Sequence, residues 1–256
     1  MANTLEELLK LNHDLRVTLL TKWQTHAFYI KEGKSWPLLY LAVQVANLHE
    51  AIELLVSKGF GREAGILLRS MFEATVNVIW IAQDPEARLD RYAAYRYFAA
   101  EQYRDLGERL PSREGQSLEQ REQYEKESEQ VRREAKKAKD QYGFRKGTYW
   151  PGKTLKEMAK EVGWLPRYEA IYKIYSDVMH SNIGSSQDFI SSSDTGTIFV
   201  QRKARFPHAN PVMREAYCYL TVAFSFADAY AGLGMEAEID EAMKKVNAIL
   251  SGQLGG

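Results

Sequence analysis

Hydrophobic residues recur every three or four positions along most of the chain, and this spacing is typical of amphipathic α-helices. In the first such segment, at residues 5–23, Leu5, Leu8, Leu15 and Leu19 keep the helical period. Further segments with this period follow at about residues 37–58, 63–83, 85–104, 154–162, 166–180, 211–233 and 235–250. The pattern predicts an all-α multi-helix bundle. Residues 63–83 should be its central helix, because they are apolar on nearly every side.

The period changes at "SSQDFISSSDTGTIFVQRKA" (residues 185–204). Two short apolar runs flank a turn-forming "SSDTG", which is typical of a small β-hairpin. Earlier in the chain, "GFGREAG" (residues 59–65) contains three glycines but follows a helix. It therefore indicates a helix–helix turn and not a nucleotide-binding loop. The chain is expected to be helical apart from this one hairpin.

A charged segment at residues 111–147 interrupts the apolar pattern. We interpret residues 1–256 as a single helical domain with this segment inserted as an exposed helical arm. The "REAKKAK" sequence at residues 133–139 is a basic cluster within the arm. A solvated helix face is favoured there over an arm that follows RNA phosphates, because the whole chain balances 34 basic against 34 acidic residues.

The cysteine and histidine content limits the chemistry. Cys218 is the single cysteine, so a disulfide framework and a zinc site made of thiolates are excluded. The histidines form neither an HExxH nor an ExxH motif, so we expect no metal and no other cofactor. The N-terminal residues are charged throughout, and the longest apolar windows look too short to span a membrane. The sequence thus predicts a cytoplasmic protein that does not contact membranes.

Polar residues gather at the end of the helix predicted at residues 166–180. Tyr172, Ser176 and His180 fall at i, i+4 and i+8, so they should share one face, and Ser181 and Asn182 follow in the turn. A histidine near a helix C-terminus has its cationic form stabilised by the helix dipole, and its ordinary pKa lies near neutrality. His180 is therefore a candidate general acid or base. The alternative, which we favour on this pattern alone, is a structural histidine bonded to a carbonyl.

A second polar pair lies in the central helix, where Arg69 and Glu73 are four residues apart. Charges in so apolar a helix need partners, so we expect the two side chains to pair with each other. The alternative places the Arg69 guanidinium in an open cleft. Tyr92 and Tyr95 of the next helix are expected to add polar groups to a neighbouring face.

Four blocks of the sequence together resemble the bacterial DUF5677 family, whose members are all-helical and have no assigned activity. The blocks are "LLRSMFEATVNVIWI", "RLDRYAAYRYF", "YWPGKTLKEMAKEVGW" and "YEAIYKIYSDVMHSN", and they span roughly residues 40–185. The resemblance implies an all-helical fold. It also implies that the recurring polar residues of the family are Arg69, Glu73, Tyr92, Tyr175, Ser176 and His180.

The arrangement is similar, more distantly, to HEPN domains, many of which cut RNA without a metal through an Arg-(four to six residues)-His motif at a dimer interface. This chain departs from that motif, since residues 173–177 contain no arginine at the required distance before His180. Lys173 lacks the planar guanidinium fork that binds phosphate in two places. Arg69 is the residue that would have to supply the missing cation from another helix.

Two functions of different classes remain open. We favour a non-catalytic module that binds a protein partner or a small ligand, with Arg69, Glu73 and His180 in a polar network. The alternative is a HEPN-like, metal-independent endoribonuclease that binds RNA, in which Arg69 and His180 meet at a solvent-reachable cavity. An enzyme acting on a small molecule is a third possibility. A homodimer is expected in either case, because residues 216–230 and 239–250 offer apolar surface to a second copy.

Overall fold

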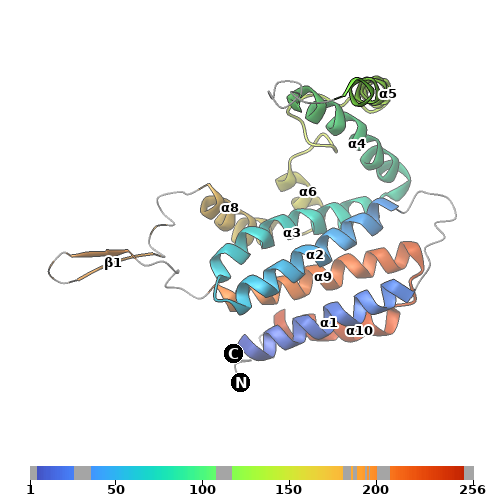
Figure 1. The fold of residues 1–256 in the computed structure, drawn as a ribbon. Helices are drawn as coiled ribbons and strands as arrows, with labels where there is room; N and C mark the ends of the chain where they lie inside the picture. The colour runs from blue at the N-terminus through green and yellow to red at the C-terminus, as the bar shows by residue number, and fades with distance from the viewer. Residues whose placement is uncertain are drawn as a thin grey trace. The chain divides into compact units, whose positions relative to one another are not determined.

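The computed structural model describes residues 5–25, 36–107, 117–180, 186, 189–193, 195, 197–200 and 208–250. Within these ranges the chain is α-helical apart from a single two-stranded sheet, which confirms the predicted fold class (Figure 1). The chain forms two compact units. The first contains residues 1–83 and 155–256, and the second contains residues 84–154.

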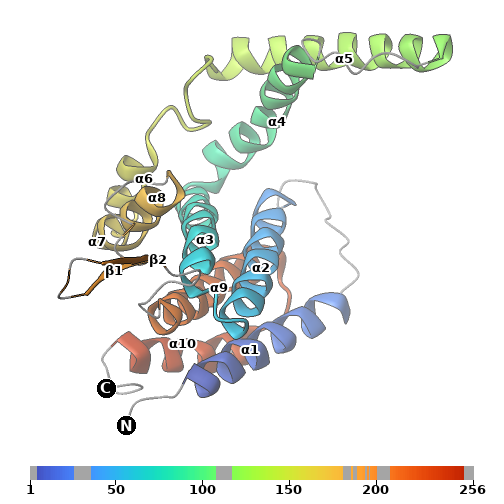
Figure 2. The same cartoon turned by 60° about the vertical axis from the view of Figure 1, so that its left-hand side comes forward.

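The first unit is a helix bundle. Its helices are α1 (Leu5–Thr25), α2 (Trp36–Ser57), α3 (Gly61–Ala82), α6 (Leu155–Glu161), α7 (Leu165–Arg167), α8 (Lys173–Met179), α9 (Ala209–Ala231) and α10 (Glu236–Leu250). Helices α2, α3 and α9 pack against one another, and α1 and α10 both pack on α9. A further face of α3 is covered by α6, α8 and the π-helical segment η1 (Tyr168–Tyr172) (Figure 2).

Helix α3 is the centre of this bundle, as its apolar composition predicts. It contacts helices on more than one side, and residues from Met71 to Ile81 are buried except for Glu73. The turn before α3 contains Gly59, whose φ of 80° favours glycine. The glycine-containing sequence therefore joins two helices, as predicted.

Two apolar helices are longer than the sequence analysis expected, since it judged every apolar window too short to span a membrane. By length and composition alone, α2 and α3 each suffice to cross a membrane. Within the most apolar window of each, 44% of α2 and 72% of α3 is buried in the fold. Core helices of bundles pass the same test, because they too are apolar on most sides.

Much of the α9 portion of the apolar surface proposed for a second copy is used inside the bundle. Tyr217, Tyr219 and Phe224 of α9 are buried, and so is the thiol of Cys218. Burial raises the pKa of the Cys218 thiol to about 12, so the group stays protonated. Helix α9 therefore supplies much of the core, whereas its last aromatic side chain, Tyr230, is exposed.

The predicted hairpin is present. Strands β1 (Ile190–Ser192) and β2 (Ile198–Val200) are antiparallel, with Ser191 opposite Phe199. All three side chains of β2 are exposed. Phe189, just before β1, lies under the guanidinium of Arg62 in the first turn of α3, with 4.5 Å from the guanidinium carbon to the ring centroid.

The second unit consists of α4 (Pro85–Gly107), α5 (Leu118–Tyr142) and the segment after α5. Helix α5 carries the charged sequence of the predicted arm. Its start has a capping box between Ser117 and Gln120. Phe98 of α4 packs with Ala138 of α5 and Phe144 in a small core of their own. The charged helix is thus packed along α4.

Charged contacts add to this packing. The Lys139 ammonium donates to the Glu101 carboxylate at 2.6 Å, and Arg104 donates to Ser128 Oγ at 2.5 Å. Both contacts join α4 to α5. Lys139 thus turns one charge of α5 toward α4, whereas most of the other charges of α5 are exposed.

Candidate functional site

Arg69 is the centre of a polar contact between α3 and the helical segment that ends in α8. Its Nε donates to Ser176 Oγ at 2.8 Å, and its Nη2 donates to Tyr172 Oη at 2.5 Å. The guanidinium carbon also lies 4.2 Å from the centroid of the Tyr172 ring. We call Arg69, Glu73, Tyr172 and Ser176 the Arg69 cluster. The Arg69 side chain is half-buried, and its guanidinium is held by the hydroxyls of Ser176 and Tyr172 and by the face of the Tyr172 ring.

A π-helical turn immediately precedes α8, where the sequence predicted one continuous α-helix over residues 166–180. Tyr168–Tyr172 forms this turn, and Ser176 Oγ donates to the Tyr172 carbonyl oxygen at 2.7 Å. A π turn changes the face on which the following side chains lie, and such turns are frequent at functional sites. Here the turn ends at Tyr172 and lies one helical turn before Ser176, and both of these residues bind Arg69.

Aromatic packing explains why this segment lies on α3. The buried ring of Phe72 on α3 packs against Tyr168 and Tyr172, with centroid distances of 6.4 and 6.0 Å. The same ring contacts Trp164 at 6.0 Å. Tyr168 and Tyr172 stack on each other at 4.9 Å. Tyr172 and Ser176 thus lie on one face, as their spacing predicts, and that face is turned toward α3 together with Tyr168.

Tyr175 of α8 also packs against α3 and is buried, with 4% of its surface exposed. Its ring passes so close to Gly65 of α3 that a Cβ added at Gly65 would overlap the Tyr175 ring atoms. Its hydroxyl lies 3.3 Å from Nδ1 of His208, which precedes α9. Tyr175, predicted as a binding residue, therefore packs between α3 and the start of α9.

His180 is at the C-terminal cap of α8 and its side chain is exposed. Its backbone N–H donates to the Ser176 carbonyl oxygen at 3.0 Å. Among the described residues, no interaction joins its imidazole to Arg69. His180 is therefore a surface residue one turn beyond the Arg69 cluster, and not a member of a buried polar network. Ser181 and Asn182 lie outside the described residues.

Glu73 is half-buried, but the expected ion pair with Arg69 is not among the interactions of the described residues. Burial raises the pKa of the Tyr172 phenol, the charge of Arg69 opposes that rise, and the charge of Glu73 adds to it. Tyr172 therefore remains neutral and accepts a hydrogen bond from Arg69. Glu73 acts on the cluster through its charge.

Tyr92 and Tyr95 belong to the second unit and pack within it. Tyr92 makes an edge-to-face contact with Trp150 at 4.8 Å, and Tyr95 packs on Phe144 at 5.3 Å. Burial raises the pKa of Tyr95. These side chains are thus accounted for by the core of the second unit.

A family profile described as "Family of unknown function (DUF5677)" matches residues 35–198, which is more than half of the chain. This chain belongs to the DUF5677 family. The resemblance to DUF5677 is thereby confirmed, and the matched region contains the whole Arg69 cluster and His180. No curated protein and no solved structure matches the chain.

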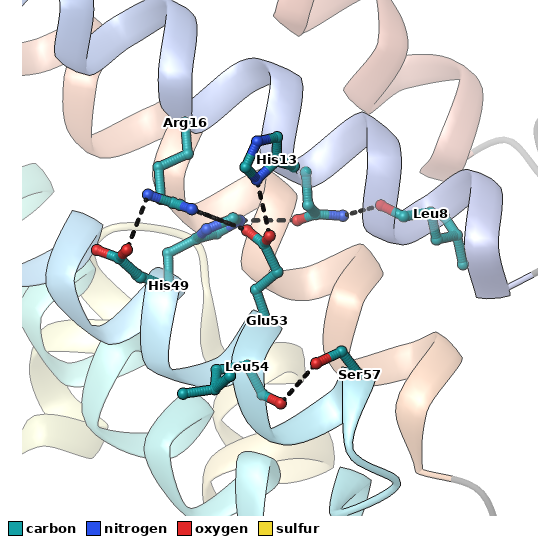
Figure 3. Close-up of polar contacts among 9 residues, drawn as sticks. Leu8, His13, Arg16, His49, Glu53, Leu54 and Ser57 are labelled. Carbon is teal, nitrogen blue, oxygen red and sulfur yellow. Dashed lines mark hydrogen bonds and ion pairs between the residues drawn. The ribbon is translucent and has the colours of Figure 1, made fainter.

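A second polar cluster of this DUF5677 member, which sequence reasoning missed, joins α1 to α2 (Figure 3). His49 of α2 is completely buried, and its Nε2 lies 2.8 Å from Asn12 Oδ1 of α1. The Asn12 amide donates in turn to the Leu8 carbonyl oxygen at 2.7 Å. The Nδ1 atom of His49 is buried without a hydrogen-bond partner within the described part of the chain.

Charges surround this histidine. Arg16 and His13 of α1 both contact the carboxylate of Glu53 on α2, and the His13 Nδ1–Oε1 distance is 2.9 Å (Figure 3). Burial, followed by the charges of Arg16 and His13, lowers the pKa of His49 from 6.5 to about 3. His49 is therefore neutral at pH 7 and donates through Nε2 to Asn12. We call Asn12, His13, Arg16, His49 and Glu53 the His49 cluster.

A sequence signal for this cluster does exist. Asn12 and Arg16 follow Leu8 at intervals of four, so two polar residues stand on an apolar face of the first helix. His49 likewise lies in an apolar helix. Metal binding is a separate question, and the residues with described positions contain no group of three or more His, Cys, Asp or Glu side chains that converge on one point.

Proposed function

We propose that this DUF5677 member is a non-catalytic module that binds a partner protein through one surface of its first unit. The residues involved are the exposed side of α8 and the β1–β2 hairpin, which follow one another in the sequence, and we call them together the α8–hairpin surface. Its exposed apolar side chains are Ile174, Met179, Ile190, Ile198, Phe199 and Val200.

The distribution of exposed apolar side chains carries the proposal. Six of the twelve large hydrophobic side chains that are exposed in the described part of the chain lie between residues 174 and 200. Val200 is 77% exposed and Ile198 is 67% exposed. Single exposed hydrophobic residues are ordinary, whereas a concentration of them marks an interaction site. A short two-stranded hairpin is also only marginally stable by itself, so a partner that covers β2 would stabilise it.

The Arg69 cluster supports this function as a scaffold. It ties α8 to the central helix through Ser176, while Tyr175 fills the space left by Gly65. Binding surfaces gain affinity when rigid elements hold them in place before the partner arrives. The hydroxyls that engage Arg69 hold its guanidinium for this structural purpose, and that weakens the case for catalysis.

A HEPN-like endoribonuclease is the competing proposal, and the exposure of His180 favours it. An exposed imidazole one turn beyond Ser176, the residue that Arg69 binds, is reachable by an RNA phosphate. This mechanism also requires Arg69 to leave Tyr172 or Ser176 and turn toward the same phosphate. The binding proposal needs no such rearrangement, and for this reason we prefer it.

The test begins with capture of partners on the purified chain, followed by identification and a Kd measured with the purified partner. The double variant Ile198→Ser/Val200→Ser removes apolar contact area from the surface, and Leu54→Ser is the matched control because Leu54 is 61% exposed on α2. We expect the double variant to weaken binding at least about tenfold and the control to leave the Kd unchanged.

A second copy of the chain is one partner that this experiment recognises. Sedimentation of the wild type and both variants then reports the homodimer directly, since only the double variant should dissociate it. Equal loss of binding in the Leu54→Ser control, or a Kd that the double variant leaves unchanged for every partner, would contradict the proposal.

A further inference from the structure

The charges of α5 are divided between the two halves of the helix. Residues 117–131 contain five glutamates and only two basic residues. Residues 132–146, which include the start of the loop after α5, contain seven basic residues and only two acidic ones. The equal numbers of acidic and basic residues in the whole chain hide this division, because the two halves offset each other. The second half is therefore strongly basic in a protein that is neutral overall.

The basic side chains of this half lie at the surface. Ala135 and Ala138 are the buried positions in the second half of α5 and face the small core shared with α4. Six basic side chains are exposed, and we call them the basic end of the second unit: Arg132, Arg133, Lys136, Lys137, Arg145 and Lys146. In Figure 2 they belong to the yellow-green end of α5 and to the loop that leaves it.

Neighbouring carboxylates neutralise only part of the basic end. Glu134 lies 2.9 Å from Lys137 and 3.8 Å from Arg133, so one carboxylate serves two cations. Lys136, Arg145 and Lys146 have no ion pair within the described part of the chain. Most of the positive charge therefore remains available to an anion from solution.

A tight turn holds the last two cations directly after α5. The Thr148 N–H donates to the Arg145 carbonyl oxygen at 3.1 Å, and Gly147 has a φ of 81°, so Lys146 lies at the tip of a turn. Phe144, just before the turn, is buried in the small core of the second unit. No described atom lies within 4 Å of a Cβ added at Gly147. The turn thus projects into solvent from a fixed base.

The chemistry of the basic end favours a nucleic acid over a membrane. A helix that lies on a membrane inserts an apolar face, and the apolar face of α5 is already packed in the core shared with α4. Among residues 117–173, no large hydrophobic side chain with a described position is exposed. Nucleic acids offer closely spaced phosphates, and the guanidinium fork of an arginine can bind a phosphate at two points.

We infer that the basic end of the second unit binds the phosphate backbone of a nucleic acid without reading its sequence. Contacts from lysine and arginine to phosphates position a strand but do not distinguish bases. The acidic first half of α5 repels the same strand, so binding is confined to the second half and the turn. The inference concerns binding alone, and it is independent of the α8–hairpin surface and of the proposed function.

Fluorescence anisotropy on the full chain tests this binding with a labelled single-stranded RNA of 16 nucleotides and a DNA of the same sequence. At 50 mM salt we expect a Kd of about 10 µM or tighter for the RNA. The DNA should bind with a Kd within about threefold of this value, because both strands offer the same phosphates. If about four cations contact phosphates, log Kd should rise with log salt concentration with a slope of about 3.

Charge reversal locates the surface. Lys136→Glu/Lys137→Glu should weaken RNA binding at least about tenfold at 50 mM salt, and Arg145→Glu/Lys146→Glu should weaken it as well. Arg121→Glu/Lys126→Glu is the matched control. It changes the charge of the protein by the same amount at two exposed positions of the first half of α5, and it should change the Kd by less than about threefold. Circular dichroism checks that all three variants are folded.

Equal weakening in the Arg121→Glu/Lys126→Glu control would overturn the inference, because it would show a response to total charge alone. Absence of RNA and DNA binding, or a Kd that salt leaves unchanged, would overturn it too. A tenfold difference between RNA and DNA would contradict binding through the backbone only. Sedimentation with phosphatidylserine vesicles is the remaining comparison, and binding to vesicles without binding to nucleic acid would assign the basic end to a membrane instead.

Discussion

The Arg69 cluster and the His49 cluster each join two helices of the first unit through polar side chains, but they use opposite electrostatics. Arg69 is permanently charged and half-buried, and it binds two neutral hydroxyls. His49 is fully buried and stays neutral because burial lowers its pKa to about 3. The contribution of the Arg69 cluster to stability should therefore not change with pH near neutrality. The contribution of the His49 cluster should fall as the solution is acidified.

The largest expected effect is the acid response of the His49 cluster. Between pH 6.5 and about 3 the unfolded chain binds a proton that folded His49 excludes, so the free energy of unfolding falls as pH falls. The slope approaches about 1.4 kcal/mol per pH unit between the two pKa values, and the loss adds up to about 4 kcal/mol between pH 6.5 and about 3. Urea unfolding at several pH values measures it.

His49→Gln keeps a donor for Asn12 and removes the titrating group, so its stability should change less over this window. His13→Gln is the control, because His13 is exposed and has contact with Glu53 only at the edge of the cluster. A slope with pH that is the same in wild type and His49→Gln would show that His49 is not excluded from protonation.

An intermediate effect is expected where Tyr175 crosses α3. Gly65→Ala places a methyl group into the space that the Tyr175 ring occupies, so that the ring or α8 must move. Overpacking of this kind costs about 1–3 kcal/mol. Thermal unfolding of Gly65→Ala and of Gly65→Ala/Tyr175→Leu checks the reason, since the smaller side chain should recover part of the loss. Gly107→Ala is the control, because nothing lies within 4 Å of its added Cβ.

The smallest expected effect is that of His180→Ala, and Arg69→Ala is the substitution with which it is compared. Arg69→Ala should lower the free energy of unfolding by about 2 kcal/mol, because it leaves Ser176 and Tyr172 without their donor. His180→Ala should change it by less than about 0.5 kcal/mol, because its side chain is exposed. Arg69→Lys should recover little, since one ammonium cannot reproduce the two bonds of the fork. Urea unfolding at pH 7 compares the three, and an equal loss in His180→Ala would contradict the separation.

The helices and the hairpin could be predicted because local rules decide them. Periodicity, Asp84 with Pro85 at the start of α4, and Gly59 after α2 each act over a few residues. The π turn at Tyr168–Tyr172 could not be predicted in this way. It is associated with the packing of Phe72 and the bonds of Arg69, and both come from a distant helix.

The candidate site was predictable in part for the same reason. The four-residue spacing of Tyr172 and Ser176 placed them correctly on one face, but it could not say that Arg69 would bind them instead of Glu73. The position of His180 at the cap left its side chain outside that face. His49 was overlooked because its partner Asn12 lies on another helix, and pairing between helices is not encoded in local spacing.

The claim that the Arg69 cluster is a scaffold and not a catalytic centre is tested most directly by RNA cleavage in EDTA. Wild type, His180→Ala and Arg69→Lys are assayed at equal concentration after their folding has been checked. The account predicts the same background rate for all three proteins. Cleavage by the wild type that either substitution abolishes, with the variant still folded, would contradict it.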